Sequence, residues 1–350
     1  MFSRWIPGPA KHYRDHFVPS NLLARVIKEM MLPADQSAQV RRQDLWAVTC
    51  FFNPSGYRRR LQNFRMFRKN LKIPLVAVEL AYNRGFELSE TDADILIRFR
   101  KRDILWQKER LLNIACRHVP SGCHKIACID CDVIFGSRDW VEETSQLLDR
   151  FEAVQLFEKV HHCPKDVSVA SLQSAVPDFT ENSFAAQLAA QASSEEMFAY
   201  VGERHQGTCS RGIAWAYRRE VLDRLGLYDA CVIGGGDTAI TCASFGRFDS
   251  AIAAHRMNPD QAAFYLKWAR PFSEFMRGSV SVVKGDVFHL WHGHISHRGY
   301  LQRHVGLAQF RFDPCRDIAL DEDGCWRWNS DKPDLHNYVR QYFESRREDG

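Results

Sequence analysis

Two aspartates stand directly behind a short apolar run in the sequence KIACIDCDVIF. Side chains alternate between the faces of a strand, so Asp130 and Asp132 are expected on one face, where a buried strand over residues 126–129 leaves its sheet. In open parallel sheets, ligands bind beyond the carboxyl ends of the strands. Two carboxylates there would suit Mg²⁺ or Mn²⁺, metals that commonly bridge phosphates. The alternative is a pair of aspartates that only caps a turn.

A second group of metal-ligand residue types lies in the sequence VFHLWHGHISH. Histidine is the commonest nitrogen ligand of metals in proteins. A site built from carboxylate and imidazole fits Mn²⁺ better than Ca²⁺, so at least one of His289, His292 and His294 is expected to be a ligand. His297 and His304 are expected to be structural. For each histidine, hydrogen bonding to a backbone carbonyl is the alternative.

Three glycines precede an acid in CVIGGGDTAI, where the acid is Asp237. The glycine spacing matches neither a dinucleotide-binding motif nor a P-loop, but glycines let the backbone approach a ligand closely. A carboxylate beside such a loop is well placed to act as a general base. The alternative is an ordinary N-cap aspartate of a helix over residues 238–243.

Strands and helices alternate around these motifs. This alternation predicts an α/β fold with a Rossmann-like, mostly parallel sheet and helices on both faces. Expected strands lie at residues 45–52, 73–80, 94–99, 126–129 and 153–157, and expected helices at 57–71, 107–116 and 139–151.

We expect a single domain with an elaborated C-terminal half, because the chain shows no repeats and no long linker. Residues 160–206 are rich in Ala, Gln, Ser and Glu, which predicts a helical insertion. Three parts are expected: an N-terminal leader packed on the core (1–44), the main domain (45–300) and a C-terminal extension (301–350). Within the main domain we expect a donor half (45–157), the insertion (160–206) and an acceptor half (207–300).

Composition narrows the class of protein. The chain has 350 residues with a net charge of +4, which is too balanced to indicate nucleic-acid binding by itself. No stretch reaches the roughly 20 apolar residues of a membrane-spanning helix, and no signal-peptide core is seen at the N-terminus. The eleven cysteines, including the CxxC pair Cys128 and Cys131, are expected to be reduced thiols of a cytoplasmic protein.

Taken in chain order, the motifs resemble those of GT-A fold glycosyltransferases, especially the inverting family-2 and β4-galactosyltransferase types. The resemblance covers roughly residues 45–294. IDCDVIF is similar to the D-x-D motif, which implies metal ligation by Asp132 and donor contact by Asp130. GGGDTAI is similar to the glycine–glycine–acid motif, which implies that Asp237 is the catalytic base. The family often has Glu-Asp here, whereas this chain has Gly236 before the aspartate.

The resemblance implies further site residues. HLWHG resembles the later histidine metal ligand, which implies His289 and His292, with His294 as the other candidate. WQKERLLN is similar to the helix before D-x-D, whose basic residue reaches the nucleotide, and implies Lys108 with Arg110 nearby. Contacts to the base and ribose are implied for the ends of the first two strands, at Cys50, Phe51, Asn53 and Glu79.

The implied activity is metal-dependent transfer of a sugar, as in hexosyltransferases. The expected donor is a nucleotide-sugar, in particular a UDP-sugar, and the expected cofactor is Mn²⁺ or Mg²⁺. The acceptor would be a hydroxyl of a glycan or a lipid-linked molecule, with inversion, in cytoplasmic polysaccharide biosynthesis. No nucleic-acid partner and no transmembrane segment are expected, and the oligomeric state stays open.

Three other functions remain as alternatives. A sugar-phosphate nucleotidyltransferase would use a similar sheet and metal, but residues 45–60 offer only NPSGYRRR in place of its usual glycine-rich signature. A metal-dependent hydrolase could use the histidines for zinc. A non-enzymatic nucleic-acid-binding protein could use the basic segment at residues 58–72, although a solvated helix face explains that segment more simply.

Overall fold

The computed structural model describes most of the chain after its first 43 residues. The described residues are 44–82, 85–190, 197–198 and 209–350. All of them belong to one structural unit, Arg42–Gly350, so the prediction of a single domain is confirmed for this part. The leader expected at 1–44 lies outside the described residues except for its last residue, as does much of the second half of the expected insertion at 160–206.

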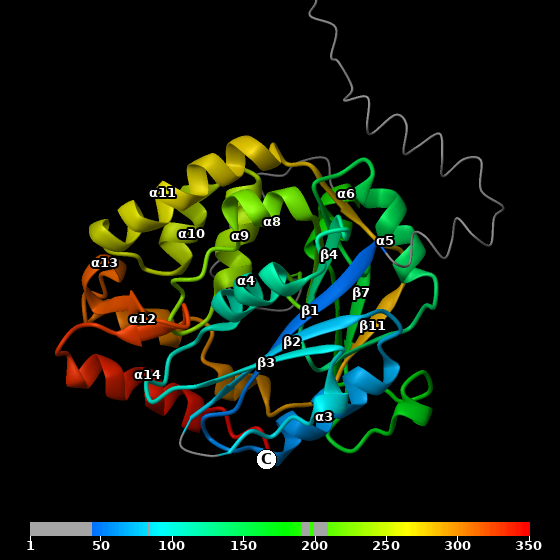
Figure 1. Ribbon diagram of the computed structural model, residues 1–350, viewed down its shortest axis with the longest axis horizontal. Coiled ribbons are helices and arrows are strands. Elements are labelled where there is room, and N and C mark those ends of the chain that lie inside the picture. The colour runs from blue at the N-terminus through cyan, green and yellow to red at the C-terminus, as the bar shows by residue number, and fades with distance from the viewer. Residues whose placement is uncertain (1–43, 83–84, 191–196, 199–208) are drawn as a thin grey trace, which may run out of the picture. The chain divides into compact units, whose positions relative to one another are not determined.

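A seven-stranded sheet with the order β10-β6-β9-β4-β1-β2-β3 lies at the centre (Figure 1). Neighbouring strands are parallel except at β9, which runs against both β4 and β6. The prediction of a mostly parallel sheet is confirmed. The strands are β1 (Leu45–Phe52), β2 (Leu75–Ala81), β3 (Ile95–Arg100), β4 (Lys125–Ile129), β6 (Ala153–Gln155), β9 (Ala214–Arg218) and β10 (Val280–Val282).

Helices cover both faces of this sheet, as predicted. Side chains of β1 alternate between two cores: Val48 and Phe52 join one, and Ala47 and Phe51 join the other. Strands buried on both faces read as continuous apolar runs, which is why β1 and β2 could be recognised in the sequence. The helices before β10 are α3 (Arg58–Asn70), α4 (Lys108–His118), α5 (Trp140–Leu148), α6 (Phe184–Ala190), α8 (Arg219–Leu225), α9 (Gly236–Ser244), α10 (Phe248–Ala254) and α11 (Pro259–Met276).

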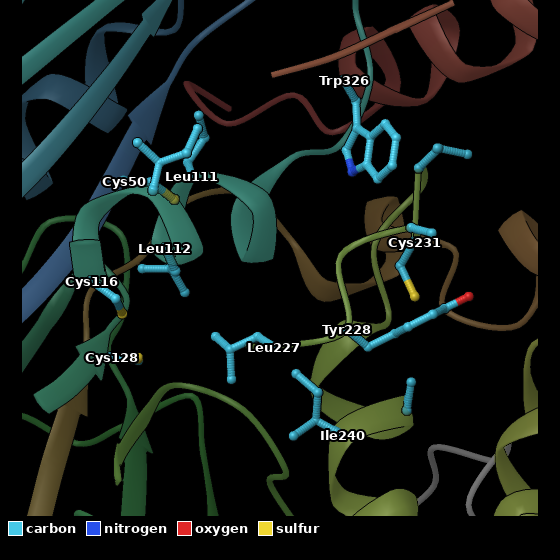
Figure 2. Close-up of a cluster of buried hydrophobic side chains, with 14 of the residues drawn as sticks. Cys50, Leu111, Leu112, Cys116, Cys128, Leu227, Tyr228, Cys231, Ile240 and Trp326 are labelled. Carbon is cyan, nitrogen blue, oxygen red and sulfur yellow. The ribbon is translucent and has the colours of Figure 1, made fainter. Parts of the chain in front are cut away.

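The first core joins segments that are far apart in the chain. Figure 2 shows Cys50 of β1 and Leu111 of α4 in one cluster with Tyr228, Cys231 and Trp326. All eleven cysteines are unpaired, and nine of them are buried. The buried cysteines serve here as small apolar residues.

A second, four-stranded sheet has the order β5-β11-β7-β8. The prediction that residues 160–206 form helices is wrong for β7 and β8. These strands are short and largely polar, with only Val160 of β7 fully buried, so they show none of the apolar periodicity by which strands are recognised. The strands are β5 (Val133–Phe135), β7 (Lys159–His162), β8 (Phe179–Asn182) and β11 (Asp286–His289).

The last fifty residues pack onto the main sheet's helices. The Gln107 side chain donates to the carbonyl of Trp326 (3.1 Å) and accepts from its backbone N–H (2.7 Å). The chain then runs back, so that its C-terminus lies beside the start of α3 (Figure 1). The remaining elements are three short 3₁₀ helices, η1 (Glu90–Asp92), η2 (Val169–Ser171) and η3 (Ile295–Arg298), then α12 (Gln302–Ala308), α13 (Pro314–Asp317), β12 (Ile318–Leu320), β13 (Trp326–Trp328) and α14 (Pro333–Ser345).

Within the described residues, no helix has both the length and the apolar character needed to cross a lipid bilayer.

The apolar face of α3 gives a stability prediction. Phe64 is fully buried, and its ring contacts those of Phe51 (centroids 5.6 Å apart) and Phe67 (6.1 Å). Phe64→Ala should lower the free energy of unfolding by about 3–5 kcal/mol, because it leaves a cavity in the core. The exposed neighbour Arg65 provides the control, since Arg65→Ala should change stability by no more than about 0.5 kcal/mol. Equal effects of the two changes in urea unfolding would contradict this packing.

Candidate active site

Strand pairing brings the two metal-ligand motifs together. The register of β11 against β5 places His289 opposite Val133, directly after the turn that carries Asp132. The backbone N–H of Leu290 also donates to the carbonyl of Asp132 (2.8 Å). The D-x-D turn and the histidine segment are therefore fixed to each other by backbone hydrogen bonds, although more than 150 residues separate them in the chain.

Asp132, His289 and His292 form a three-residue group whose ligand atoms all lie within 4.8 Å of one another. Oδ2 of Asp132 is 3.1 Å from Nδ1 of His292, and Oδ1 is 3.4 Å from Nε2 of His289. Asp132 Oδ1 is buried and makes no hydrogen bond. Apart from the ion pair with His289, this buried oxygen has no polar contact among the described residues, and a bound cation would stabilise it further. His294, the other candidate, is exposed and does not belong to this group.

The protonation states of this group suit a metal. Burial alone would raise the pKa of Asp132, but His289, Arg298 and Arg60 outweigh burial and hold it below its usual value. Burial, reinforced by Arg298, holds the pKa of His292 well below its usual value. At neutral pH the group thus offers a carboxylate and a neutral imidazole. Metals bind these deprotonated forms, and two nitrogens with one oxygen fit Mn²⁺.

A second layer of side chains orients His289. Its Nδ1 lies 3.1 Å from Nδ1 of His162, whose Nε2 lies 3.2 Å from a carboxylate oxygen of Glu181. Contacts at one ring nitrogen direct the other toward the metal site, here toward Asp132. His162 and Glu181 belong to β7 and the neighbouring β8, a region expected to be a helical insertion, so sequence reasoning missed both. Only the pairing of His162 with His289 across β7 and β11 reveals their role.

Lys108 connects two acids that the sequence placed in separate motifs. Its ammonium lies 2.8 Å from Asp130 and 3.1 Å from Asp237. Both aspartates and Lys108 line a cavity of about 220 Å³, whose wall also includes His289 and His292. One cavity therefore brings together residues that were expected from four motifs, namely the D-x-D motif, the helix before it, the glycine-rich motif and the histidine cluster.

The charges in this cavity are coupled. Burial alone would lower the pKa of Lys108, but Asp130 and Asp237 outweigh burial and raise it well above its usual value, so Lys108 is a cation. Burial raises the pKa of Asp130 to about 6, against the opposing effect of Lys108. Burial also raises the pKa of Glu109, the next residue of α4, to about 8.

The glycines of the GGGD motif make room for side chains of the protein. Gly235 has a positive φ of 103°, and a Cβ there would lie 2.7 Å from Nε2 of His255. A Cβ on Gly236 would lie 2.3 Å from the carboxyl carbon of Glu109. Gly235 itself is the N-cap of α9, and Asp237 in the first turn pairs with Lys108. The motif can therefore be explained without a ligand close to the glycine backbone. It can also be explained without Asp237 as the N-cap of the helix.

The residues expected to hold the base and ribose lie elsewhere. Phe51, Asn53 and Glu79 line a second cavity of about 150 Å³. Glu79 accepts a hydrogen bond from the N–H of Leu88 (3.2 Å) and pairs with Arg98, so its carboxylate holds the loop before η1. The Asn53 side chain bonds both the N–H and the carbonyl of Tyr57.

Two expected donor contacts line neither cavity. Cys50 packs in the first core, where burial raises its thiol pKa far above the ordinary value (Figure 2). Arg110 turns away from the site, donating to the carbonyl of Gly324 (2.6 Å) and pairing with Asp229 (3.1 Å). Of the two basic residues expected at the donor, only Lys108 reaches the cavity that holds Asp130.

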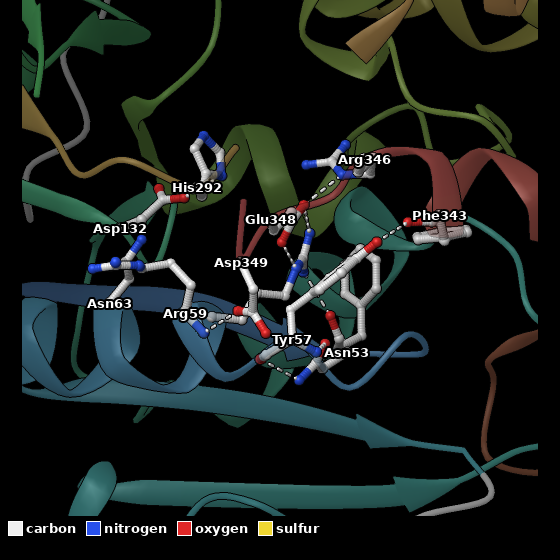
Figure 3. A network of polar contacts seen from close by, with 12 residues as sticks. Asn53, Tyr57, Arg59, Asn63, Asp132, His292, Phe343, Arg346, Glu348 and Asp349 are labelled. Carbon is white, nitrogen blue, oxygen red and sulfur yellow. Dashed lines mark hydrogen bonds and ion pairs between the residues drawn. The ribbon is translucent and has the colours of Figure 1, made fainter. Parts of the chain in front are cut away.

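The C-terminal tail, residues 346–350, reaches the metal-ligand group, a contact that sequence reasoning missed. Glu348 is fully buried and pairs with Arg346 (Figure 3). It also pairs with Arg60, and Arg298 lies 3.9 Å away. Arg298 donates to the carbonyl of His292. The charged tail sequence RREDG gave no signal of burial, because charged residues are rarely buried unless paired.

The side chains of Asn63 and Asp349 fix the histidine segment and the tail to α3. The Asn63 amide donates to the carbonyl of Trp291 (3.0 Å), next to His292 (Figure 3). Asp349 accepts from the N–H groups of Arg58 (3.2 Å) and Arg59 (2.9 Å), so the end of the chain caps a helix that lacks an acidic residue in its first turn. The position of His292 thus depends on α3 and on the tail.

Known proteins were compared with the whole chain. No protein-family model and no curated protein sequence matches it. Among solved structures, it is similar to the mannosyltransferase PcManGT from Pyrobaculum calidifontis in complex with GDP-Man and Mn²⁺, at 15% identity over 92% of this chain and 79% of that one, with a TM-score of 0.37.

It is also similar to glucosyl-3-phosphoglycerate synthase from Mycobacterium tuberculosis in complex with Mn²⁺, UDP and phosphoglyceric acid, at 11% identity over 81% of this chain and 85% of that one, with a TM-score of 0.41. A third similar structure is the 4-diphosphocytidyl-2C-methyl-D-erythritol synthase of Anaerococcus prevotii, at 10% identity over 71% of this chain and 89% of that one, with a TM-score of 0.30. At such values the activity of this chain has to be inferred from its own residues.

The buried tail carboxylate gives a second prediction. Glu348→Gln removes the counter-charge of Arg60, Arg298 and Arg346, and breaking a buried pair costs about 3–5 kcal/mol. Burial alone would raise the pKa of Glu348, but the three arginines lower it, so its contribution is complete at neutral pH and is lost only as pH falls below the ordinary glutamate range. Urea unfolding at pH 7 should show the loss, together with weaker Mn²⁺ binding in titration calorimetry.

Glu344→Gln is the matched control, because the Glu344 side chain is exposed on the preceding helix. It should leave both stability and Mn²⁺ affinity unchanged. If Glu348→Gln behaved like this control, the tail would have no part in holding the metal-ligand group.

Proposed function

We propose that the chain is a GT-A type glycosyltransferase that moves a hexosyl group from a nucleotide-sugar, with a UDP-sugar as donor, to an acceptor hydroxyl. The observation that carries the proposal is the shared cavity. In its wall, His289 and His292, which flank the carboxylate of Asp132, lie with a lysine that bridges two further carboxylates. A metal group beside a cation and a carboxylate suits departure of a diphosphate and activation of a hydroxyl.

Asp132, His289 and His292 would hold the divalent cation, which is expected to be Mn²⁺ and supplies Lewis acidity at the diphosphate when bound. Three cationic side chains of the same cavity wall reinforce this end of the site. Lys108 neutralises Asp130, and Arg298 and Arg346 place positive charge behind His292. These fixed charges stabilise the negative charge that develops on the leaving diphosphate.

Asp237 is the proposed general base. In the reaction, the acceptor oxygen forms a bond to C1 of the sugar, the bond from C1 to the diphosphate oxygen breaks, and the hydroxyl proton passes to the Asp237 carboxylate. Attack and departure on opposite sides of C1 invert the configuration. The position of Asp237 across Lys108 from Asp130 supports this separation of acceptor and donor sides.

The cavity lined by Phe51, Asn53 and Glu79 is the proposed position of the uracil and ribose. Aromatic and amide groups at the carboxyl end of β1 suit a base, and the support here is the resemblance of TCFFNPSGY to the corresponding loop of the family. We further propose a cytoplasmic location and a glycan or lipid-linked acceptor in polysaccharide biosynthesis. The unpaired cysteines support a reducing compartment.

Loss of the carboxylate ligand tests the metal site. Asp132→Ala should abolish the rise in melting temperature that UDP produces only in the presence of Mn²⁺, because binding to the native state raises that temperature by mass action. Release of UDP from UDP-sugars should fall by about 100-fold or more, which is the order of one lost electrostatic contact. The exposed Asp139, close to the same turn, supplies the control variant Asp139→Ala. Full activity of Asp132→Ala would disprove the assignment.

The proposed base makes a different prediction. Asp237→Asn keeps the shape of the side chain, so the Mn²⁺-dependent shift with UDP should persist while transfer falls by about 10²–10⁴-fold, the usual contribution of a general base. Asp249→Asn, on the exposed side of α10, should be indistinguishable from wild type. The base role would be wrong if Asp237→Asn lost donor binding yet still turned over the donor that it bound.

A further inference from the structure

The cavity that holds Asp237 carries an excess of positive charge. Lys108 pairs with Asp130 and Asp237, the two acids of the cavity wall. Two arginines of the wall, Arg298 and Arg346, pair with Glu348. For the other two arginines of the wall, Arg211 and Arg303, no carboxylate of the described residues lies within ion-pair distance. The cationic lining residues are Lys108, Arg211, Arg298, Arg303 and Arg346, and the acidic ones are Asp130 and Asp237.

Arg211 is the more exceptional of the two unpaired arginines. Its Nε is buried and has no hydrogen-bond partner among the residues that the structure describes. The guanidinium lies over the ring of Phe184, 5.9 Å from its centroid, which is a weak interaction compared with the hydration that it has lost. A buried charged donor without an acceptor is costly, so a ligand that supplied the acceptor would gain that energy.

Arg303 is held in place by neutral groups only. Its Nη1 donates to the hydroxyl of Tyr342 (2.7 Å), and its Nε lies 3.3 Å from Nε2 of His304. The rings of Tyr300 and Tyr342 flank the guanidinium at 5.1 and 5.6 Å. The positive potential here is strong, because Arg303 and its neighbours outweigh burial and lower the pKa of Tyr342 to about 8. Arg303 is thus preorganised, and no carboxylate within the described part of the chain pairs with it.

Both arginines flank the segment that carries the proposed base. Arg211 precedes Gly212, where a Cβ would lie 2.6 Å from Oδ2 of Asp237. Arg303 packs against Gly234, with Nη1 3.2 Å from a Cβ built there. Of the other lining cations, Lys108 contacts both Asp130 and Asp237, and Arg298 donates to the carbonyl of His292.

The titratable groups nearest to Arg303 do not neutralise it. His255 and His304 stack with ring centroids 4.4 Å apart, and both line the cavity. Burial, reinforced by Arg303, lowers the pKa of His255 to about 3, and burial holds that of His304 well below its usual value. Both rings are neutral at pH 7, so neither supplies a negative charge that would balance Arg303.

We propose that Arg211 and Arg303 form an anion subsite for the acceptor, beside Asp237. The acceptor would carry a phosphate or a carboxylate in addition to its reactive hydroxyl, and guanidinium groups suit both anions because they donate two parallel hydrogen bonds. This inference rests on the proposed function, since it is the assignment of Asp237 as base that marks this side of the cavity as the acceptor side.

The test compares a charged probe with its neutral counterpart. Glycerol 3-phosphate and glycerol are titrated by calorimetry into wild type, Arg211→Met and Arg303→Met, each saturated with UDP and Mn²⁺. Wild type should bind only the phosphate, and each variant should bind it at least about tenfold more weakly, with UDP affinity unchanged. Arg303→Lys keeps the charge and should retain part of the affinity. Arg270→Met, on an exposed face of α11, is the control.

Three results would overturn the subsite. The first is equal binding of both probes by wild type. The second is unchanged affinity for glycerol 3-phosphate in both methionine variants. The third is loss of UDP affinity in those variants, because that result would assign the arginines to the donor. Failure of wild type to bind UDP with Mn²⁺ would instead refute the proposed function. The same titration on the protein without UDP would then still decide whether the two arginines bind anions.

Discussion

The pairing of β11 with β5 is the constraint on which the site depends. Because His289 lies opposite Val133, backbone pairing places two imidazoles beside the carboxylate of Asp132. The buried Oδ1 of Asp132 makes no hydrogen bond among the described residues, and its ion pair is with His289. A site of this kind is preorganised, so binding of a cation requires little movement of the protein.

Several side-chain contacts hold Asp132, His289 and His292 in this arrangement. His162 and Glu181 orient one imidazole, and the tail glutamate Glu348 holds Arg298 against the carbonyl of His292. The tail carries charges that neutralise each other when it is docked, which explains how a polar peptide can be buried near a polar site. The last residues of the chain therefore act as part of the site's wall.

The sequence predicted what depends on local pattern. Continuous apolar strands showed the sheet. Residue types at a strand end pointed to Asp130 and Asp132, and the glycine-rich motif pointed to Asp237. The fold places these acids with Lys108 around one cavity or beside it. It did not predict what depends on pairing between distant segments. The strands β7 and β8 are too short and polar to show a period, so His162 was missed, and the choice among the three candidate histidines required the register of β11.

Charge balance could not be read from the sequence either. Arginines such as Arg60 and Arg346 are common in a basic chain, and only their burial around Glu348 distinguishes them from the unpaired Arg211 and Arg303. Arg110 shows the same limit from the other side, since it lies two positions from Lys108 but turns toward Asp229. On a helix, residues two positions apart do not share a face.

Pulsed electron paramagnetic resonance of Mn²⁺ bound to the protein tests the central claim most directly. With one equivalent of Mn²⁺, the spectra should show couplings to imidazole nitrogens that disappear in His289→Ala and His292→Ala together, and added UDP should introduce coupling to phosphorus. Bound Mn²⁺ without nitrogen coupling would place the metal elsewhere. Nitrogen coupling without any phosphorus coupling would mean that the site holds a metal but no nucleotide diphosphate, and the account of this protein as a glycosyltransferase would be wrong.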